Sequence, residues 1–374
     1  MDACRDCLRR SWLLAELSGR LEYRANDHER LFDLLALDDA RLVRAIAGRR
    51  RGELRARYAR FEPQDIGPSA DVAAICWHHH GFPHALTGKG APRMLYVAGG
   101  TQRLEALGAA PAVAIVGSRR ATDYGMEMAR SLARGLAASG VTVTGGLSDG
   151  IAVAAQAGAL EVDGKTLTVM DGGLDVACPA RRRALYERVR SVGCAVAELP
   201  CDCASRRWSK IARERIVVGV AELTIVVEAD EGPVELLGAR IAKALGRRVA
   251  AVPGRVTSPV SRGTHALLRE GAALVRGPGD ALELLGHPNA PRSVDGMPRQ
   301  LTSAPQPPEL EPRLRATLEQ VGAGRDTPAK LTAGSADAGE VLLALSELEL
   351  MGLLTRGDGG RYVPRESLAG GASL

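Results

Sequence analysis

The chain has 374 residues, of which 45% are hydrophobic and 25% are charged, and its formal net charge is +5. This is the composition of a globular protein that is long enough for more than one domain. No apolar run reaches the roughly 18 residues of a membrane-spanning helix, and the first residues lack the apolar core of a signal peptide. We therefore expect a cytoplasmic protein without membrane insertion.

Residues 1–62 predict a small helical (SAM-like) domain, because leucines recur at helical spacing between Ser11 and Tyr58. The same stretch is rich in arginine: eight arginines lie between Arg41 and Arg60, against a single acidic residue, Glu53. Two interpretations stay open, a solvated helix face and a surface that contacts a polyanion.

The seven cysteines are scattered along the chain. Cys4 and Cys7 form one CxxC pair without a second pair, and Cys201 and Cys203 are separated by one residue. A zinc site needs four ligands at suitable spacing, and the histidines at 78–80 do not complete such a pattern in the sequence. The sequence therefore predicts no metal ion and no cofactor.

A linker rich in proline, glycine and serine follows the helical domain at residues 61–70. Residues 70–286 then alternate apolar strands with helices, which predicts an α/β domain with an extended, Rossmann-like, doubly wound parallel sheet. Strands are expected at residues 73–77, 94–98, 112–116, 141–144, 165–170, 195–198, 223–228 and 248–252. Helices are expected at residues 124–139, 151–160, 181–191, 211–219, 234–245 and 263–270.

Three of these strands end in glycines, in the segments 117–120, 145–150 and 171–173. Glycine lets the backbone approach a ligand, and the helix after each loop directs free N–H groups toward an anion. The segments match neither the dinucleotide fingerprint nor a Walker motif. Arg119 favours a phosphate-binding edge, because a guanidinium aimed over the sheet edge is costly to bury unless it meets an anion. Ordinary turn chemistry is the alternative.

The C-terminal part predicts a proline-rich linker at residues 287–310 and a compact domain at residues 311–366. Helices at 314–321 and 339–351, followed by a glycine-turned hairpin up to residue 363, suggest a winged helix. The second helix carries Glu340, Glu347 and Glu349 and no basic residue, so it would attract phosphate poorly. This favours contact with protein over contact with DNA.

The order of these motifs resembles the DprA (Smf) family of DNA-processing proteins over most of the chain. The matching segments are Phe82-Pro83-His84-Ala85-Leu86, Val116-Gly117-Ser118-Arg119, Gly146-Leu147-Ser148-Asp149-Gly150-Ile151, Gly164-Lys165-Thr166, Gly173-Leu174-Asp175, Pro179, Glu198-Leu199-Pro200, Arg213-Glu214-Arg215-Ile216-Val217, Val227-Glu228-Ala229, Val252-Pro253-Gly254 and Gly263-Thr264-His265-Ala266-Leu267-Leu268. The resemblance implies a Rossmann-like central domain with a helical domain before it and a winged helix after it.

The resemblance also implies a function. Proteins of this family bind single-stranded DNA during natural transformation and load the RecA recombinase onto it, and they dimerise through the central domain. We therefore expect a homodimer in which Ile216, Val217 and Val218 lie beside the β-branched strand. The implied DNA contacts, all residues of the matched motifs, are Gly117, Ser118, Arg119, Gly146, Ser148, Gly150, Lys165, Arg213 and Arg215. Arg119 and Lys165 are expected to face one groove.

Several positions depart from the family pattern. Glu214 replaces the asparagine of the Arg-Asn-Arg signature, and His265 replaces the asparagine of the Gly-Thr-Asn motif. The remaining departures fall at Gly145, Ser148, Ala152, Gln156 and the segment Pro233 to Gly238. The chain is thus a divergent member, whose DNA affinity or RecA function could differ from that of the family.

The residue chemistry predicts binding without catalysis, because no nucleophile with a base and no metal with carboxylate ligands is recognisable. Only 3% of residues are aromatic, so base stacking cannot be widespread. Trp208 is the best stacking candidate, and a role as a core tryptophan is equally compatible with the sequence. Two other functions remain open, a nucleoside-monophosphate phosphoribohydrolase of the LOG group, whose glycine-rich loops are missing here, and a nucleotide sensor.

Overall fold

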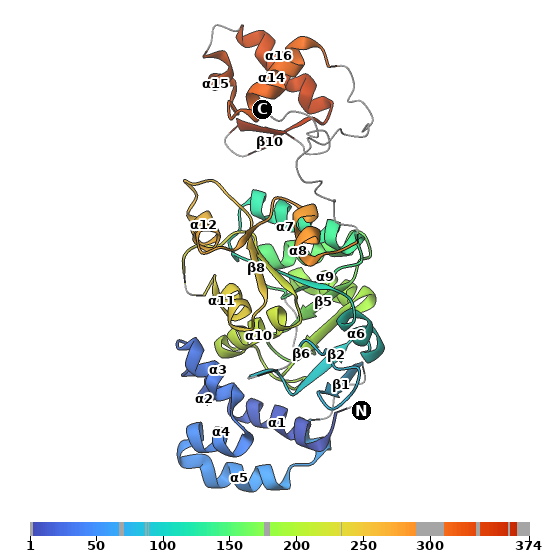
Figure 1. The fold of residues 1–374 in the computed structure, drawn as a ribbon, viewed down its shortest axis with the longest axis vertical. Coiled ribbons are helices and arrows are strands. Elements are labelled where there is room, and N and C mark those ends of the chain that lie inside the picture. Colours follow the sequence, from blue (N-terminus) through green and yellow to red (C-terminus); the bar gives the residue numbers. More distant parts are fainter. Residues whose placement is uncertain are drawn as a thin grey trace. The chain divides into compact units, whose positions relative to one another are not determined.

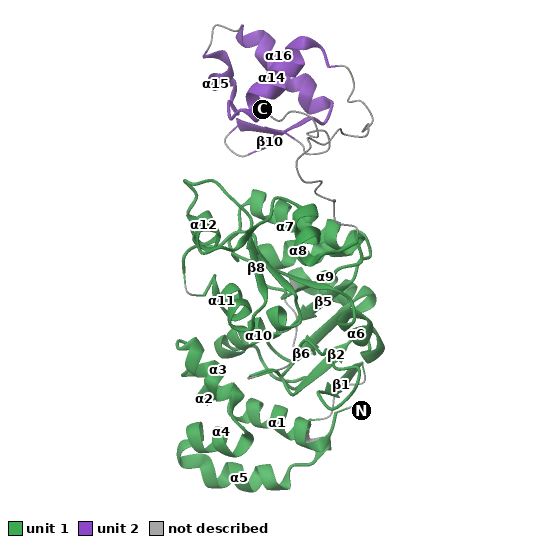
Figure 2. Cartoon of the chain, viewed as in Figure 1, with its two compact units in different colours: residues 1–293 green, residues 294–374 purple. Residues whose placement is uncertain are grey.

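The computed structural model describes residues 3–66, 71–86, 88, 90–175, 180–232, 234–288, 310–333, 337–357 and 360–364. The chain divides into two compact units, residues 1–293 and residues 294–374 (Figure 2). Several features of the sequence analysis lie wholly or partly outside the described residues, among them Pro179, Pro233, Cys178, the end of the first linker, most of the proline-rich linker and part of the glycine turn of the C-terminal hairpin.

Unit 1 is built on one nine-stranded sheet with the order β1-β2-β6-β5-β4-β3-β7-β8-β9. The strands are β1 (Val72–Cys76), β2 (Met94–Ala98), β3 (Ala112–Val116), β4 (Thr142–Gly145), β5 (Thr166–Val169), β6 (Cys194–Ala197), β7 (Leu223–Val226), β8 (Arg248–Ala251) and β9 (Ala273–Leu274). Strands β3 to β9 are mutually parallel, whereas β1 and β2 form an antiparallel edge on β6. The predicted doubly wound α/β fold is confirmed, and the antiparallel edge is an addition to it.

The apolar runs form strands because both faces of the sheet are covered. In β3, Val113 and Ile115 pack into one core cluster, while Ala114 packs into the other. Helices α7 (Asp123–Ala138), α8 (Ile151–Leu160) and α13 (Pro278–Leu285) supply the first face. Helices α10 (Arg207–Gly219), α11 (Leu237–Ala244) and α12 (Arg262–Arg269) pack into the cluster of the second face. Two further helices, α6 (Thr101–Gly108) and α9 (Ala180–Val192), complete the α/β region.

The N-terminal helices share the core of the second face. They are α1 (Arg5–Glu16), α2 (Ser18–Glu22), α3 (His28–Ala36), α4 (Asp39–Ile46) and α5 (Arg51–Arg60), with short 3-10 turns at Gly48–Arg50 and Pro63–Ile66. Figure 1 shows them gathered at one end of unit 1. Trp12 packs on Phe61 with ring centroids 5.7 Å apart, and both residues join the cluster that continues into β1, β2 and α10. Phe61, expected in a linker, is thus a buried core residue.

Unit 2 contains, within the described residues, helices α14 (Pro312–Gly322), α15 (Pro328–Thr332) and α16 (Ala338–Leu350) and an antiparallel hairpin of β10 (Leu354–Gly357) and β11 (Arg361–Pro364). Leu314, Leu345 and Tyr362 belong to its separate core. Leu342 and Leu350 of α16 are exposed. Among the described residues of both units, no helix is long and apolar enough to cross a membrane.

Candidate nucleic-acid interface

The carboxyl edge of the parallel strands contains the topological switch point of the fold. Strands β3 and β7 are neighbours, and the chain winds away from them in opposite directions, through β4, β5 and β6 on one side and β8 and β9 on the other. Open α/β sheets bind ligands in the crevice outside such a point. In this molecule that point lies where the loop after β3 meets the loop after β7.

A carboxylate of the protein itself occupies the helix N-terminus at this switch point. Glu228, 3% exposed, accepts hydrogen bonds from the backbone N–H of Thr122 (2.8 Å) and from the Thr122 hydroxyl (2.7 Å) at the start of α7. A Cβ at Gly125 would lie 2.3 Å from Glu228 Oε2, so only glycine fits beneath the carboxylate. A phosphate at this edge must therefore be held outside the α7 N-terminus.

Backbone hydrogen bonds join the loop after β3 to the loops after β4 and β7. The Ser118 N–H donates to the Glu228 carbonyl (2.6 Å), and the Ile151 N–H donates to the Ser118 carbonyl (3.2 Å). Gly150 adopts φ +78°, and a Cβ there would lie 2.2 Å from the Ser118 carbonyl oxygen. A Cβ at Gly117 would similarly lie 2.5 Å from the Glu228 carbonyl oxygen. These residues are thus required for the close approach of the loops, which holds exposed Arg119 at the edge.

Two arginines pair with one carboxylate beside these loops, and the charge of a third, Arg119, also acts on it. We call Arg119, Arg181, Arg182 and Asp149 the Asp149 cluster. Arg182 and Arg181, from the first turn of α9, form ion pairs with Asp149 at 2.6 Å and 2.8 Å. Burial raises the pKa of Asp149, but the hydrogen bond from Arg182 and the charges of Arg182, Arg181 and Arg119 lower it by more, so it lies below its ordinary value. The three arginines and one carboxylate of the cluster together carry a net charge of +2.

Arg213 lies deeper, over the glycine loop after β4. A Cβ at Gly146 would lie 2.9 Å from the Arg213 guanidinium carbon, so Gly146 makes room for this side chain. The guanidinium pairs with Glu214 at 2.5 Å and with Asp171 at 3.6 Å, and the side chain is 11% exposed. Burial lowers the pKa of Arg213, but the charges of Glu214 and Asp171 raise it by more. The departure at Glu214 thus gives Arg213 an internal partner.

Two residues of the predicted interface belong to the core. Trp208 is fully buried, and its Nε1 donates to Ser18 Oγ at 2.8 Å, which ties α10 to α2. Arg215 is 7% exposed and forms two hydrogen bonds to the Glu198 carboxylate, at 2.6 Å and 2.7 Å. In this conformation neither side chain has a free surface for a base or a phosphate, so the stacking interpretation of Trp208 is wrong here and the core interpretation holds.

Lys165 lies at the opposite edge of the sheet from Arg119. Thr166 pairs with Val143, and the preceding residue of β4 pairs with Ala112, the first residue of β3. Lys165 is therefore level with the amino ends of these parallel strands, whereas Arg119 lies just beyond the carboxyl end of β3. The expectation that both face one groove is wrong, because a residue before one strand and a residue after another strand of the same parallel sheet lie at opposite edges of that sheet.

The structure also places the three residues named with the homodimer and two of the departures from the family pattern. Ile216, Val217 and Val218, expected beside the β-branched strand, are at most 1% exposed within a single chain. Gln156 is fully buried and accepts a hydrogen bond from the Thr166 hydroxyl, so this departure from the family pattern has no surface that a ligand could touch in this conformation. His265 lies within 3.1 Å of the Gly254 carbonyl through Nε2.

Of the remaining predicted residues, Ser148 is half-buried in the loop after β4, and Ala152 is half-buried in the first turn of α8. The eight arginines at residues 41–60 are all exposed. Three of them form ion pairs, Arg41 with Asp38, Arg50 with Glu53 and Arg57 with Glu16. Both interpretations of that arginine-rich surface stay open.

Sequence reasoning missed the arginines of α9 and the cations that begin α10. Arg206, Arg207 and Lys210 are exposed where the loop after β6 enters α10. The available signal was the run of three arginines at residues 181–183, directly after a strand and a loop. A cationic run at a strand-to-helix connection of a parallel sheet lies at the carboxyl edge by topology alone.

Comparisons with known proteins agree with this architecture. Residues 73–286 match the family model described as DNA recombination-mediator protein A. A relative from Mycobacterium tuberculosis, a putative DNA processing protein DprA, is 44% identical over 176 residues; the match covers 47% of this chain and 45% of the relative, so the chain spans about half of that protein. The solved structure of DprA from Streptococcus pneumoniae superposes with a TM-score of 0.60 at 26% identity over 76% of this chain and 98% of that one.

A second similar structure is that of DNA processing protein A from Helicobacter pylori, which was solved to describe how that protein binds single-stranded DNA. It superposes with a TM-score of 0.51 at 26% identity, over 57% of this chain and 95% of that one.

Proposed function

Because the chain belongs to the family of DNA recombination-mediator protein A, we propose that it binds single-stranded DNA and loads the RecA recombinase onto it during natural transformation. The observation that carries the proposal is the Asp149 cluster, with three guanidiniums around one carboxylate at the carboxyl edge of the sheet. The Helicobacter pylori relative supports the nature of the ligand, since it is a single-stranded DNA-binding protein. Family membership favours this function over the phosphoribohydrolase and sensor alternatives.

The cluster suits a phosphate chain. Arginine can bind a phosphate with two parallel hydrogen bonds. Arg119 is exposed and forms no ion pair among the described residues, so a phosphate would displace no partner from it. The exposed cations Arg206, Arg207 and Lys210 extend the positive surface toward α10. A strand of phosphates running from the Asp149 cluster toward α10 would meet cations at both ends.

Binding of this kind reads phosphates and not bases. Phosphate contacts position a nucleic acid without sequence information, and the one tryptophan of α10 is buried. We therefore propose binding that is independent of base sequence and strongly dependent on salt. Glu214, which pairs with Arg213, is expected to weaken the contribution of that cation relative to a family member with asparagine at this position.

Unit 2 and assembly complete the proposal. We propose that unit 2 contacts protein, because α16 exposes Leu342, Leu343 and Leu350 and carries three glutamates and no basic residue. We also keep the homodimer as a proposal, resting on the family alone, since the three residues that suggested an interface are internal.

A salt series tests the function directly. Binding of labelled oligo(dT) and of the matching duplex is measured at rising salt, with the wild-type chain and Arg181→Ala. Affinity for the single strand should fall with salt by a slope of about −0.7 for every phosphate contacted, and Arg181→Ala should flatten that slope. Equal affinity for the duplex, or an affinity that ignores salt, would contradict the proposal.

A further inference from the structure

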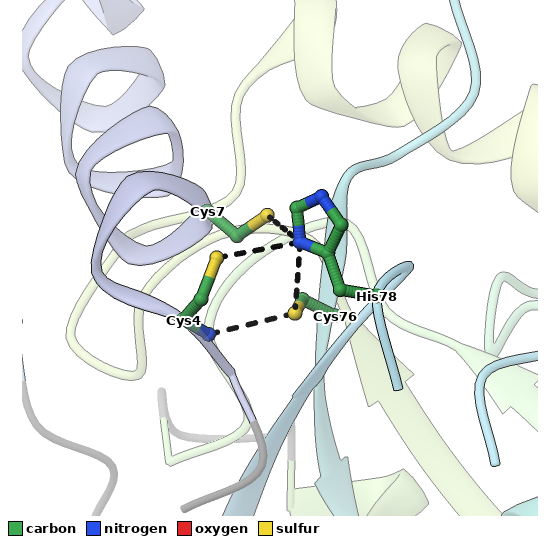
Figure 3. A group of neighbouring side chains, drawn as sticks. All are labelled: Cys4, Cys7, Cys76 and His78. Carbon is green, nitrogen blue, oxygen red and sulfur yellow. Dashed lines mark hydrogen bonds between the residues drawn. The ribbon is translucent and has the colours of Figure 1, made fainter. Parts of the chain in front are cut away.

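A second cluster lies where the start of α1 meets the end of β1, the outermost strand of the sheet and four places from β4 in the strand order. Cys4, Cys7, Cys76 and His78 each direct one ligand atom to a common point, and these four atoms all lie within 4.8 Å of one another. Figure 3 shows the two cysteines of the α1 segment on one side and Cys76 and His78 of the β1 segment on the other, with their side chains turned toward one another.

The local structure brings these residues together from two distant pairs. Cys4 is the N-cap residue of α1, and Cys7 lies in the first turn of that helix. Cys76 is the last residue of β1, and His78 lies in the turn that leads away from it. Packing of α1 against the antiparallel edge of the sheet therefore places a Cys-x-x-Cys pair opposite a Cys-x-His pair.

The distances match tetrahedral coordination. The three sulfurs lie 3.4, 3.7 and 3.7 Å from His78 Nδ1, for Cys4, Cys7 and Cys76 respectively. With Zn–S of about 2.3 Å, Zn–N of about 2.0 Å and tetrahedral angles, a sulfur and a nitrogen bound to one zinc ion lie about 3.5 Å apart. The observed separations fall on both sides of this value, and every other pair of the four atoms lies within 4.8 Å, so the four atoms surround a space of the size that one ion needs.

The surroundings give an ion access to the cluster. The Cys4 backbone N–H lies 3.5 Å from the Cys76 sulfur and donates a hydrogen bond to it, which ties the start of α1 to the end of β1. Cys7 and Cys76 are buried, whereas Cys4 and His78 are exposed and close the group from the solvent side. Ordinary core cysteines would explain the two buried sulfurs but not the convergence of the two exposed side chains on them.

We propose that Cys4, Cys7, Cys76 and His78 bind one zinc ion. Four protein ligands leave no open coordination position, which is the mark of a structural and not a catalytic zinc site. The ion would fasten the N-terminus of α1 to the edge strand β1. This proposal replaces the sequence-based prediction of no metal, and it is independent of the proposed DNA binding.

The test begins with the metal content of the full chain. Protein produced with zinc in the medium and purified under reducing conditions without chelator is measured by elemental analysis and should hold one zinc ion per chain. Replacement by Co²⁺ should produce the intense visible bands and sulfur-to-cobalt charge transfer of a tetrahedral thiolate site. Removal of the metal with a strong chelator should lower the melting temperature and leave the affinity for oligo(dT) at the same salt within about twofold, since β1 is four places from β4 in the strand order and the two clusters share no residue.

Matched variants separate the site from general damage. Loss of a residue that only hydrogen-bonds to a zinc ligand typically weakens metal binding by about 10- to 100-fold, and His78→Ala should weaken it by more. His80 is also exposed and lies outside the cluster, so His80→Ala should keep the full metal content. Cys4→Ser serves as a second ligand variant at an exposed position.

Three results would overturn the proposal: no metal in the wild-type chain together with no cobalt spectrum; full zinc content in both His78→Ala and Cys4→Ser; or a disulfide between cysteines of the cluster in protein kept reduced until analysis. Iron in place of zinc would overturn the identity of the metal.

Discussion

Replacement of Arg119 by alanine tests the carboxyl-edge model most directly. Arg119 is exposed, and the hydrogen-bonded loops beneath it are held by backbone contacts that do not involve its side chain. The substitution should therefore change the free energy of unfolding by no more than about 0.5 kcal/mol. If the guanidinium contacts a phosphate, the loss should be that of one charge-assisted hydrogen bond, about 1.5–3 kcal/mol of binding.

That range corresponds to a rise in Kd of about 10- to 150-fold, because 1.36 kcal/mol is a factor of ten. The assay is a fluorescence-anisotropy titration of labelled oligo(dT) and of a mixed-sequence oligonucleotide at one fixed salt concentration, and both should lose affinity equally. Arg119→Lys should restore only part of the loss, since lysine acts as a point charge.

Lys165→Ala is the matched control, because it removes one exposed cation at the opposite edge of the same sheet. It should weaken binding clearly less than Arg119→Ala. The reasoning fails if Lys165→Ala has the larger effect, or if Arg119→Ala lowers the melting temperature sharply while DNA binding is unchanged.

Three further predictions concern the other residues of unit 1. Glu214→Gln removes the carboxylate that pairs with Arg213 and should increase the affinity for single-stranded DNA in the same titration; unchanged affinity would show that Arg213 is not a contact. Trp208→Ala removes a fully buried side chain and its hydrogen bond to Ser18, so urea unfolding should show a loss of about 3–5 kcal/mol, and a loss below about 1 kcal/mol would contradict the core assignment. Sedimentation at micromolar concentration should show a dimer, and a single monomeric species would remove that proposal.

The sequence alone determined those features whose signals are local. The β-branched and apolar runs, such as Ala112–Val116, predict strands because buried parallel strands must be apolar on both faces. Their alternation with helices predicts the parallel sheet, and its topology is set by the way that such units connect. The glycines at 117 and 150 were correctly placed at the strand ends, where a Cβ would collide with a neighbouring loop.

Only the tertiary structure decided which side chains meet and which stay accessible. In the sequence, Lys165 and Arg119 are both cations close to a glycine that flanks a strand. The sheet register places them at opposite edges. On α10, Trp208 lies five residues before Arg213 and Arg215 two residues after it, and the N-terminal helices and Glu198 bury them. Burial of this kind depends on partners far away in the chain, which no local pattern contains.

The Cys-x-x-Cys pair of α1 is the clearest case. Its partners lie at the end of β1, and Cys7 and Cys76 are separated in the sequence by most of the N-terminal helices and the first strand. Zinc ligands that lie close together in sequence are recognisable from their spacing, but this set is assembled only when α1 packs on the edge of the sheet. The spacing was uninformative because the distance that matters is set by the packing of a helix on a strand, not by the number of residues between them.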